Sequence, residues 1–514
     1  MDDRVLAAAL VLAAAVVLFF RLGQGPLLDF DEATYAEIAR EIGAYHDFVH
    51  LHFNFTPWFN KAPLYQWLTA GLFQVFGPSE LWARAVSAAA GAGVVGLTYL
   101  VGRTWLERLP AAGAALIVLL SNLFVRAARF GTSDILLTFW IYLGIYGYLR
   151  TRGSPRWWYL VGASWGLAFM TKDIASLVGP AAVVVALVID GRLAALRRPE
   201  PYAAVALAVA IALPWHIAMY LWQGSAFLQQ YISYMVVARA QAQIEGHTGG
   251  LGYYAIWSGI GFYPWVFAAV AGFIPHVLVD IRERRASSVL AVLTVGVLAL
   301  YTVVRSKLYW YIDPLMPAYA LFAAAGIAWL LRRRAVELAA IAALVAAVGI
   351  WISPNTVSGL PVWLQWTFTA VLVAAVIASL ARGGRPLPVV AAGALAFTVA
   401  SAITVAPLYD LPEQPGRALG VPARTEGSGP LLLYVSNEAV QFPNDNVAHS
   451  LGFYSHRQVI TLFGADALRA SVSCGRTADV VLDQVDLAAV ESDYAVTPHK
   501  AWFRLQLDTL RSRC

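Results

Sequence analysis

Three carboxylates follow the first apolar segment of the chain. Asp29, Asp31 and Glu32 lie shortly after the run that ends near Phe20. Carboxylates at the end of a membrane-spanning segment are costly, so they indicate a chemical use. We interpret Asp31 as a general base, with Glu32 as a second catalytic candidate. Glu32 opposes ionisation of Asp31 whereas a helix N-terminus favours it, so the sequence leaves the pKa of Asp31 open.

The lysines supply the opposite charge. They are Lys61, Lys172, Lys307 and Lys500. The first three fall in the first outer loop or at outer ends of predicted spans, where the orientation rule disfavours positive charge. Cations that converge there would bind an anion, most naturally phosphate, opposite the base. The alternative is an arginine-biased composition with a few scattered lysines.

The composition places these residues in a membrane protein. The 514 residues are 59% hydrophobic and 13% charged, with 18 tryptophans and a mean hydropathy of +0.63, outside the soluble range. Apolar runs of spanning length recur along most of the chain and predict about thirteen spans. The predicted fold class is an all-α polytopic membrane protein.

Arginine clusters orient the spans, because short cytoplasmic loops are rich in Lys and Arg. The clusters taken as cytoplasmic are Arg103/Arg108, Arg150/Arg152/Arg156, Arg192/Arg197/Arg198, Arg282/Arg284/Arg285, Arg332 to Arg334 and Arg382/Arg385. This alternation puts the N-terminus inside. It puts the loop 21–81, the loop 221–255 and the chain after about residue 408 outside. The run Val5 to Phe20 is interpreted as a retained first span rather than a cleaved signal peptide.

Two helices are predicted in the first outer loop. Apolar residues recur at helical spacing between Tyr35 and Ile42, with Glu37, Arg40 and Glu41 on the other face, which is typical of an amphipathic surface helix. Asp29 or Asp31 is expected to cap its N-terminus. A second surface helix is predicted over 63–73.

The chain changes character after about residue 408. Short runs at 431–435 and 478–482 have strand composition and lie between helical segments. We therefore predict a membrane domain over 1–407 and a small extracytoplasmic α/β domain over 408–514. The two cysteines, Cys474 and Cys514, both lie in this second domain; pairing and free thiols stay open.

The motifs in this order resemble those of a known family, the polyprenyl-phosphate-dependent GT-C glycosyltransferases of the ArnT and protein O-mannosyltransferase group. They are Asp31-Glu32-x-x-Tyr35-Ala36-Glu37-Ile38, Lys61-x-Pro63-Leu64-x-x-Trp67, Arg84-x-x-Ser87, Arg129-x-x-x-x-Asp134-x-x-Leu137, Gly166-x-x-x-x-Thr171-Lys172, Pro214-Trp215 and Lys307-x-x-x-Tyr311-x-x-Pro314-x-x-Pro317. The resemblance covers about residues 1–330 and is nearest to the aminoarabinose transferase branch. It implies the GT-C fold.

The resemblance also implies roles for the matched residues. Asp31 would be the family's catalytic acid, Lys61 a ligand of the lipid phosphate, and Asp134 a second carboxylate facing the same cavity. The further residues implied for the phosphate or donor side are Arg84, Lys172, Arg239, Lys307 and Tyr311. The partners would be an undecaprenyl-phosphate-linked sugar, an envelope acceptor such as lipid A, and the bilayer of a bacterial inner membrane. The reaction would invert the anomeric carbon.

One departure concerns a metal. The aminoarabinose branch has Glu-Lys-Pro-Pro or a close variant where this chain has Asn60-Lys61-Ala62-Pro63. If that glutamate helps to hold a metal in relatives, Asn60 puts such a metal in doubt here, so a divalent metal cofactor stays open. His247, in a glycine-rich outer loop, is equally open as an acceptor or metal ligand or as part of a flexible loop.

Several of these residues have plainer explanations. Asp134 could pair with Arg129 or Arg126 at a span end. Lys172 and the adjacent Asp173 could form a solvated turn. The aromatic cluster Tyr309 to Tyr311 could be an interfacial belt.

Other function classes fit less well. A lipid-linked sugar flippase or other transporter would also carry charges in the membrane, but no internal repeat is visible. A lipid-linked glycan ligase or polymerase lacks the acidic first-loop motif, and a protein acceptor stays an alternative to a lipid one. No nucleotide-binding fingerprint is present. The net charge of +5 comes largely from the orienting arginines, so it does not indicate nucleic-acid binding.

Overall fold

The computed structural model describes residues 2–243, 248–262, 265–283, 287–332, 413–436 and 444–513, with the single positions 370, 374 and 378. The chain divides into two compact units. The helical unit comprises Met1–Phe20, Asn60–Leu64 and Ser87–Tyr409, and the sheet unit comprises Arg21–Phe59, Tyr65–Val86 and Asp410–Cys514.

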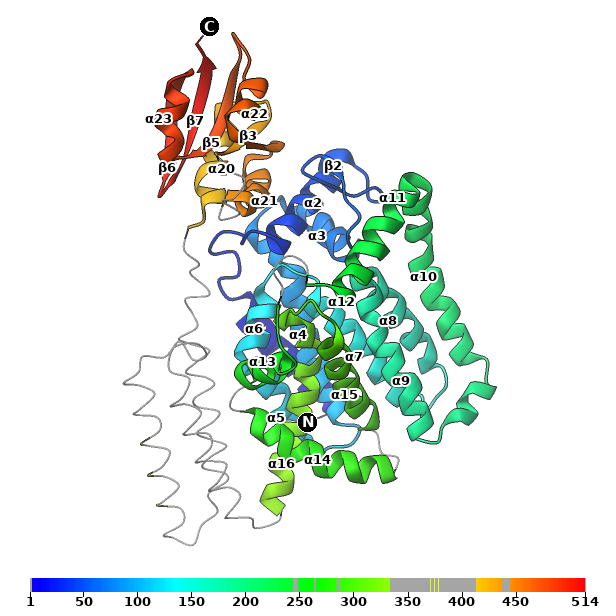
Figure 1. Ribbon diagram of the computed structural model, residues 1–514. Helices are drawn as coiled ribbons and strands as arrows, with labels where there is room; N and C mark the ends of the chain where they lie inside the picture. Colours follow the sequence, from blue (N-terminus) through cyan, green and yellow to red (C-terminus); the bar gives the residue numbers. More distant parts are fainter. Residues whose placement is uncertain are drawn as a thin grey trace. The chain divides into compact units, whose positions relative to one another are not determined.

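Helices account for the described part of the helical unit (Figure 1). They are α1 (Asp3–Phe19), α4 (Glu80–Gly102, whose first turns belong to the sheet unit), α5 (Arg108–Leu120), α6 (Asn122–Arg129), α7 (Asp134–Arg150), α8 (Trp157–Lys172), η1 (Asp173–Leu177), α9 (Val178–Ile189), η2 (Leu193–Arg197), α10 (Glu200–Gln223), α11 (Ser225–Leu228), the π-helix η3 (Gln229–Ala238), α12 (Arg239–Gln241), α13 (Tyr253–Gly261), α14 (Trp265–Glu283), α15 (Ser288–Val303), η4 (Tyr309–Leu315) and α16 (Met316–Arg332).

Small residues let these helices approach closely. In α8, a Cβ on Gly162 would lie 2.3 Å from the carbonyl oxygen of Ala204 in α10. A Cβ on Gly272 in α14 would lie 1.9 Å from the carbonyl oxygen of Phe322 in α16. Helices packed through such contacts are typical of membrane bundles, where van der Waals contact replaces the hydrophobic effect.

Among the described residues, four helices are long and apolar enough to cross a bilayer. They are Glu80–Gly102, Trp157–Ile189, Glu200–Gln223 and Tyr309–Leu330. The pair Arg108–Leu120 and Asn122–Arg129, bent by 62°, makes a fifth if it is one span. The spans predicted between about residues 335 and 408 lie outside the described residues, so the count of thirteen stays a prediction.

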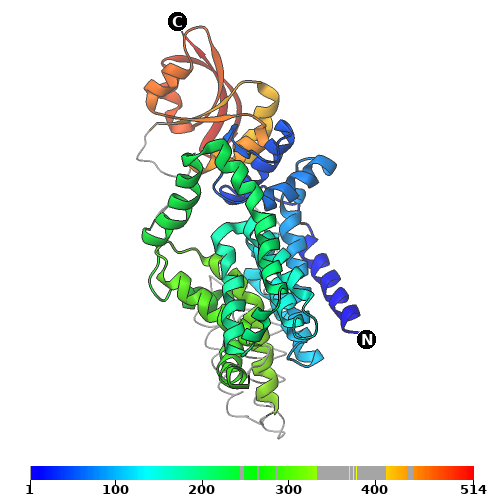
Figure 2. The same cartoon turned by 90° about the vertical axis from the view of Figure 1, so that its right-hand side faces the viewer.

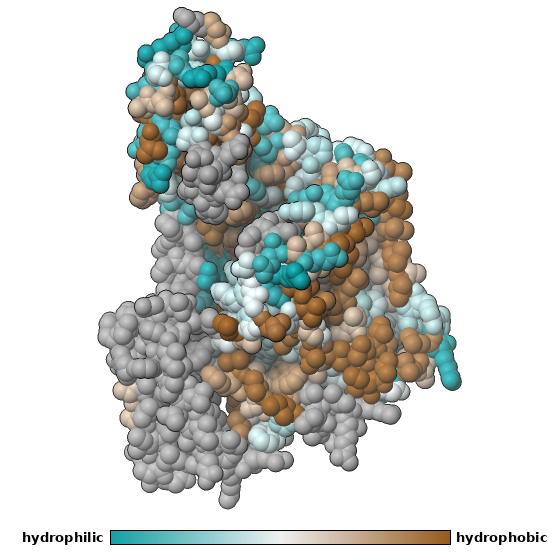
Figure 3. All heavy atoms as spheres, viewed as in Figure 1, coloured by the Kyte–Doolittle hydropathy of each residue, from teal (hydrophilic) through white to brown (hydrophobic). Residues whose placement is uncertain are grey.

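Apolar side chains cover the outside of several helices of this unit. Val205, Val209 and Leu213 of α10 are exposed, and Figure 3 shows apolar atoms gathered over this region. In the turned view of Figure 2, α1 is the dark blue helix at the end marked N. Its Leu12 and Val16 are likewise exposed. Faces of this kind suit contact with lipid.

The sheet unit contains a five-stranded mixed sheet with strand order β4-β3-β5-β7-β6. The first loop contributes α2 (Asp31–Tyr45), β1 (His52–Phe53), β2 (Thr56–Pro57) and α3 (Leu64–Phe76); the C-terminal segment contributes α20 (Pro415–Glu426), β3 (Leu431–Val435), α21 (Asn444–Ser455), β4 (Val459–Phe463), α22 (Gly464–Ser471), β5 (Thr477–Asp483), η6 (Gln484–Asp486), α23 (Leu487–Glu491), β6 (Tyr494–Trp502) and β7 (Leu505–Ser512). Strand β3 pairs in parallel with β4 and β5, and β7 pairs antiparallel with β5 and β6.

Both faces of this sheet are apolar, because β3 alternates its side chains between two cores. Leu431 and Leu433 pack with residues of α20 and α21. Leu432 and Tyr434 pack with residues of α22 and α23. The two strands predicted from the sequence are therefore present as β3 and β5. Cys474 is disulfide-bonded, and the other cysteine, Cys514, lies outside the described residues.

The first loop differs from its predicted role in one respect. Helix α2 forms where it was predicted, but it is buried on almost every side, including Glu37 and Glu41. It packs against α21 of the same unit. The expectation that its acidic face would meet solvent was wrong, because periodicity does not register a second layer that covers the polar face.

Candidate active site

The carboxylates of the first loop lie at the start of α2. Asp31 is the first helical residue and is half-buried. The preceding residue, Phe30, has φ +69° and makes no side-chain cap hydrogen bond, so the cap by Asp29 or Asp31 stays a prediction. Asp29 accepts hydrogen bonds from the backbone N–H of Ser450 (3.1 Å) and from its hydroxyl. Burial raises the pKa of Asp29 to about 6.

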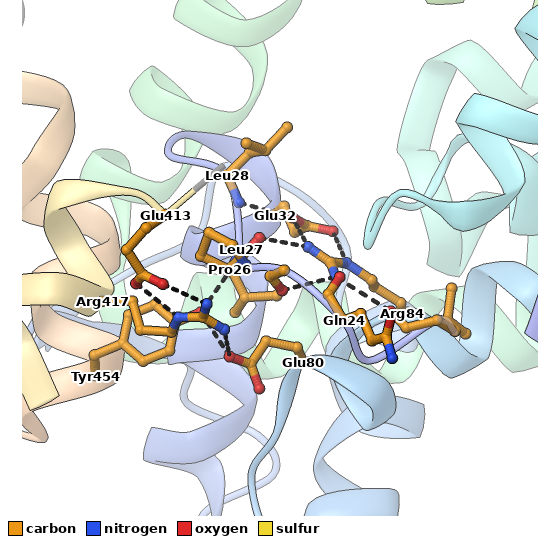
Figure 4. Close-up of polar contacts among 12 residues, drawn as sticks. Gln24, Pro26, Leu27, Leu28, Glu32, Glu80, Arg84, Glu413, Arg417 and Tyr454 are labelled. Carbon is orange, nitrogen blue, oxygen red and sulfur yellow. Dashed lines mark hydrogen bonds and ion pairs between the residues drawn. The ribbon is translucent and has the colours of Figure 1, made fainter. Parts of the chain in front are cut away.

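Glu32 and Arg84 form the main ion pair of this loop (Figure 4). Nε and Nη2 of Arg84 donate to the two carboxylate oxygens at 2.8 and 3.0 Å. The Leu28 N–H also donates to Glu32, at 2.8 Å. Both charged side chains are buried, so each compensates the desolvation of the other.

The same guanidinium shapes the loop in front of Asp31. It donates to the backbone carbonyls of Leu22, Gln24, Gly25 and Pro26 at 2.7 to 3.3 Å. An arginine with this many partners fixes the path of the chain. Arg84 and Glu32 thus hold the loop in front of Asp31. Phosphate binding by Arg84 and catalysis by Glu32 stay predictions.

A second polar cluster holds this loop from the C-terminal segment (Figure 4). The hydroxyl of Tyr454 accepts from the Leu27 N–H at 2.8 Å and donates to Glu80 at 3.1 Å. Arg417 donates to Glu80 and to Glu413. These two carboxylates raise the pKa of Arg417, with Glu413 the larger cause. Tyr454 and Arg417 were not predicted as site residues, because the first-loop partners Leu27 and Glu80 lie more than 300 residues away in the chain.

The start of α2 also meets α21. Oγ1 of Thr34 lies 2.5 Å from Nδ1 of His449. The imidazole of His449 lies 5.8 Å from the ring of Phe30 and 5.0 Å from that of Phe53, centroid to centroid. Both ends of the short segment Asp29–Thr34 are therefore attached to one helix of the C-terminal segment.

In the helical unit, Asp134 and Lys172 form an ion pair. Asp134 begins α7 and Lys172 ends α8, and these two helices pack together. The ammonium of Lys172 lies 5.8 Å from the centroid of the Tyr311 ring. Three predicted site residues are thus brought together. Arg129, one of the alternative partners of Asp134, donates to the carbonyls of Leu18 and Phe20 at the end of α1.

Sequence reasoning missed a third carboxylate in this cluster. Asp313 of η4 is 1% exposed and interacts electrostatically with Asp134 and Lys172. Among the described residues, neither of its oxygens has a hydrogen-bond partner. The only sequence signal was its place two residues after Tyr311.

The Lys61 segment joins the cluster through Asp173. The Ala62 N–H donates to Oδ1 of Asp173 at 3.0 Å. Asp173 interacts electrostatically with both Lys61 and Lys172. The interpretation of Lys172 and Asp173 as a solvated turn was wrong, since both side chains bind other elements of the helical unit.

Arg239 and Lys307 lie on adjoining segments. The carbonyls of Arg239 and Ala240 accept from the N–H groups of Ser306 and Arg305, both at 3.2 Å. The Lys307 ammonium donates to the carbonyls of Tyr301 and Thr302 at 2.7 and 2.6 Å. It therefore binds the C-terminal end of α15, where a cation is favoured. His247 lies outside the described residues.

A metal site needs several His, Cys, Asp or Glu side chains that lie close together. Over the described residues, no group of three or more His, Cys, Asp or Glu side chains is arranged to hold a metal ion. Asn60, the residue that raised the question, accepts a 2.9 Å hydrogen bond from the side chain of Gln230.

Comparison with known proteins shows which families and structures this chain resembles. A family model described as dolichyl-phosphate-mannose-protein mannosyltransferase matches residues 60–222. The undecaprenyl phosphate-alpha-4-amino-4-deoxy-L-arabinose arabinosyl transferase of Aeromonas salmonicida is 29% identical over 338 residues, which are 62% of this chain and 60% of that protein. The corresponding protein of Aeromonas hydrophila is 30% identical over 330 residues, 61% of this chain and 59% of that protein.

The fold agrees as well. The crystal structure of ArnT from Cupriavidus metallidurans bound to undecaprenyl phosphate matches with a TM-score of 0.77 and 22% identity, over 98% of this chain and 97% of that one. The chain is thus similar in sequence to ArnT proteins and has the fold of this ArnT crystal structure. It spans about 60% of the length of the curated ArnT relatives that it matches. The structural match establishes the fold of this chain.

Proposed function

We propose that this protein is a membrane glycosyltransferase that moves a sugar from undecaprenyl phosphate to an acceptor in the cell envelope. The observation that supports this proposal most directly is the cluster of Lys61, Lys172 and Asp134 around Asp173. The similarity to ArnT proteins gives this cluster its functional context. Cations beside carboxylates at the ends of spans suit a leaving lipid phosphate. The names of the Aeromonas relatives support an undecaprenyl-phosphate donor.

Each candidate residue takes a role in this proposal. Asp31 deprotonates or orients the acceptor hydroxyl or phosphate, and Lys61 binds the donor phosphate. Asp134, Lys172 and Tyr311 line the donor site. Glu32 and Arg84 act by positioning Asp31. The residues proposed for the wider donor surface or the acceptor loop are Arg239, Lys307 and His247.

The stereochemistry and topology belong to the same proposal. A single displacement with one base inverts the anomeric carbon. The membrane part spans the bacterial inner membrane about thirteen times, with the N-terminus in the cytoplasm and residues 408–514 in the periplasm. Reporter fusions at the arginine-rich loops and at the C-terminus test this arrangement directly.

The test is transfer by the purified protein. A panel of undecaprenyl-phosphate sugars is offered with lipid A, and separately with envelope proteins, because the matching family model is named for a protein acceptor. We expect Asp31→Asn to abolish transfer and Lys61→Ala to raise KM for the donor. The matched controls are Asp466→Asn and Lys500→Ala, which change exposed residues of the sheet unit.

The outcomes separate the proposed function from its alternatives. Release of undecaprenyl phosphate that stops in Asp31→Asn supports the glycosyltransferase with its base in the first loop. Full activity of Asp31→Asn contradicts the assignment of the base. Movement of the lipid-linked sugar across proteoliposome membranes without release of undecaprenyl phosphate favours the flippase.

A further inference from the structure

Asp173 has a backbone conformation that suits glycine. It follows the last residue of α8 with φ +42° and ψ −134°, a region that side chains with a Cβ rarely enter. Non-glycine residues persist there when surrounding contacts hold them, and such positions cluster at functional sites. The contacts of the Asp173 side chain therefore indicate what it does.

Asp173 links two elements. Its Oδ1 accepts from the Ala62 N–H at 3.0 Å and from the hydroxyl of Tyr231 in the π-helix η3. The neighbouring Gln230 donates to Asn60 at 2.9 Å. The segment that carries Lys61 is thus attached to η3 and η1 on both sides of the lysine.

The hydrogen bonds continue to a histidine. The Tyr231 hydroxyl lies 2.7 Å from Nε2 of His216 in α10. Nδ1 of His216 lies 2.8 Å from the carbonyl oxygen of Ala212. Tyr231 is buried, and Trp215 and Phe227 lie beside it. The middle of this series of polar groups is therefore shielded from water, whereas Asp173 and His216 at its two ends are half-buried.

The number of protons shared by Asp173, Tyr231 and His216 follows from their hydrogen bonds. A carbonyl oxygen only accepts, so Nδ1 of His216 carries a proton. The Tyr231 hydroxyl has one proton and two partners, Asp173 and Nε2, so one partner must donate to it. Either Nε2 is protonated and Asp173 ionised, or Asp173 is protonated and His216 neutral. In both states the three groups hold one proton more than a carboxylate, a phenol and a neutral imidazole.

We propose that Asp173, Tyr231 and His216 form a proton-shifting chain that adapts the charge beside Lys61 to the binding of a lipid phosphate. When the site is empty, the carboxylate of Asp173 compensates Lys61 and Lys172. When the phosphate binds, the Nε2 proton moves to the Tyr231 oxygen as the Tyr231 proton moves to Asp173. An N–H bond becomes an O–H bond, no proton enters or leaves, and Asp173 no longer repels the phosphate.

The surroundings of the chain fit this role. The charged groups that face Asp173 are Lys61 and Lys172, and Lys172 also pairs with Asp134. An ionised Asp173 would oppose an arriving phosphate, whereas a neutral one would leave both lysines to it. This inference rests on the proposed function for the identity of the anion.

The test is binding of undecaprenyl phosphate in detergent micelles at pH 8. Tyr231→Phe and His216→Gln interrupt the chain and leave Asp173 ionised, so we expect binding to weaken about tenfold. Asp173→Asn keeps an acceptor for the Ala62 N–H and removes the charge, so binding should equal or exceed that of wild type. The double variant Asp173→Asn/Tyr231→Phe should bind like Asp173→Asn alone. Tyr220→Phe, exposed on α10, is the matched control.

The competing explanation is a purely structural hydrogen-bond chain. It predicts that Asp173→Asn weakens binding as Tyr231→Phe does, which would overturn the proposal. Asp173→Gly relieves the backbone strain and removes the anchor of Ala62. We expect Asp173→Gly to be at least as heat-stable as wild type but to bind the lipid phosphate more weakly than Asp173→Asn.

A ligand-free measurement separates this proposal from the proposed function. The ¹⁵N signals of the His216 ring should change in Asp173→Asn, because the shared proton has lost its second carrier. Unchanged signals would refute the shared proton even if the protein transfers sugars. If the signals change but the protein binds no undecaprenyl phosphate, the shared proton is supported and the proposed donor is refuted.

Discussion

The guanidinium of Arg84 binds the carboxylate of Glu32 through two hydrogen bonds of 2.8 and 3.0 Å, although 52 residues separate them in the chain. Glu32 is adjacent to Asp31, the proposed base. The position of that base therefore depends on an ion pair buried within the sheet unit.

Loss of Arg84 should unfold this loop before it affects chemistry elsewhere. Arg84→Gln leaves Glu32 buried without its counter-charge, which should cost about 3–5 kcal/mol of stability. Thermal unfolding in detergent measures the loss. Arg469→Gln, which removes an exposed pair with Asp493, is the control and should leave the melting temperature unchanged. Equal effects of the two substitutions would contradict the assignment.

Glu41 should destabilise the protein at alkaline pH. Burial, with the nearby Glu37 charge, raises the pKa of Glu41 to about 8. A raised pKa means that the folded state binds more protons than the unfolded state, so stability falls as pH rises from about 4.5 to 8. Glu41→Gln keeps an acceptor for the Phe55 N–H and should stabilise the protein by about 2–4 kcal/mol at pH 8.5 and much less at pH 5.

Glu37→Gln is the matched comparison for Glu41→Gln. Glu37 accepts two hydrogen bonds from Arg40, at 2.7 and 2.6 Å, so its neutralisation should destabilise the protein at both pH values. The two glutamates lie about one helical turn apart in α2. If both substitutions shift the melting temperature in the same direction at pH 8.5, the difference between their environments is refuted.

Asp29 should lose its proton over a lower pH range than Glu41. Because its pKa is raised to about 6, its ionisation reduces stability between about pH 4 and 6 and has no further effect above that. Asp29→Asn should gain about 1–3 kcal/mol relative to wild type as pH rises through this window. Ser450→Ala removes the hydroxyl that favours the ionised form and should move the window upward. If the stability difference between Asp29→Asn and wild type stays constant from pH 4 to 7, the raised pKa of Asp29 is refuted.

Substitutions of Asp134 and Lys172 should affect stability and sugar transfer differently. Asp134→Leu or Lys172→Met alone leaves one charge without its partner and should cost about 3–5 kcal/mol of stability. The double variant restores an apolar contact and should recover most of the melting temperature but none of the sugar transfer. Recovery of transfer in the double variant would show that the pair is structural only.

Local elements of the fold were predictable because their signals lie within a few residues. Strand β3 (Leu431–Val435) coincides with the predicted run. Helix α2 includes the predicted segment 35–42, and α3 (Leu64–Phe76) begins one residue after the start of the predicted segment 63–73. The membrane character followed from apolar runs, since no other environment accepts them at that length. Asp134, Lys172 and Tyr311 were selected by motif, and the structure places them together.

Partners of buried polar groups were not predictable in this way. The sequence does not indicate that Tyr454 and Ser450 reach the first loop, or that Asp173 binds Tyr231 rather than water. A hydrogen bond depends on distance and direction in space, and the chain folds back over hundreds of residues to create it.

By itself, the sequence indicated a membrane protein, carried motifs that resemble those of ArnT proteins, and placed acids and lysines next to apolar runs. Composition and short-range periodicity carry that information, because burial and lipid contact select residue types locally. Only the tertiary structure showed that Glu32 and Arg84 form an ion pair and that Glu41 is buried. It also showed that Asp173 connects the Lys61 segment to Tyr231, which in turn contacts His216. Those relationships exist only when distant segments desolvate one another, so no local pattern encodes them.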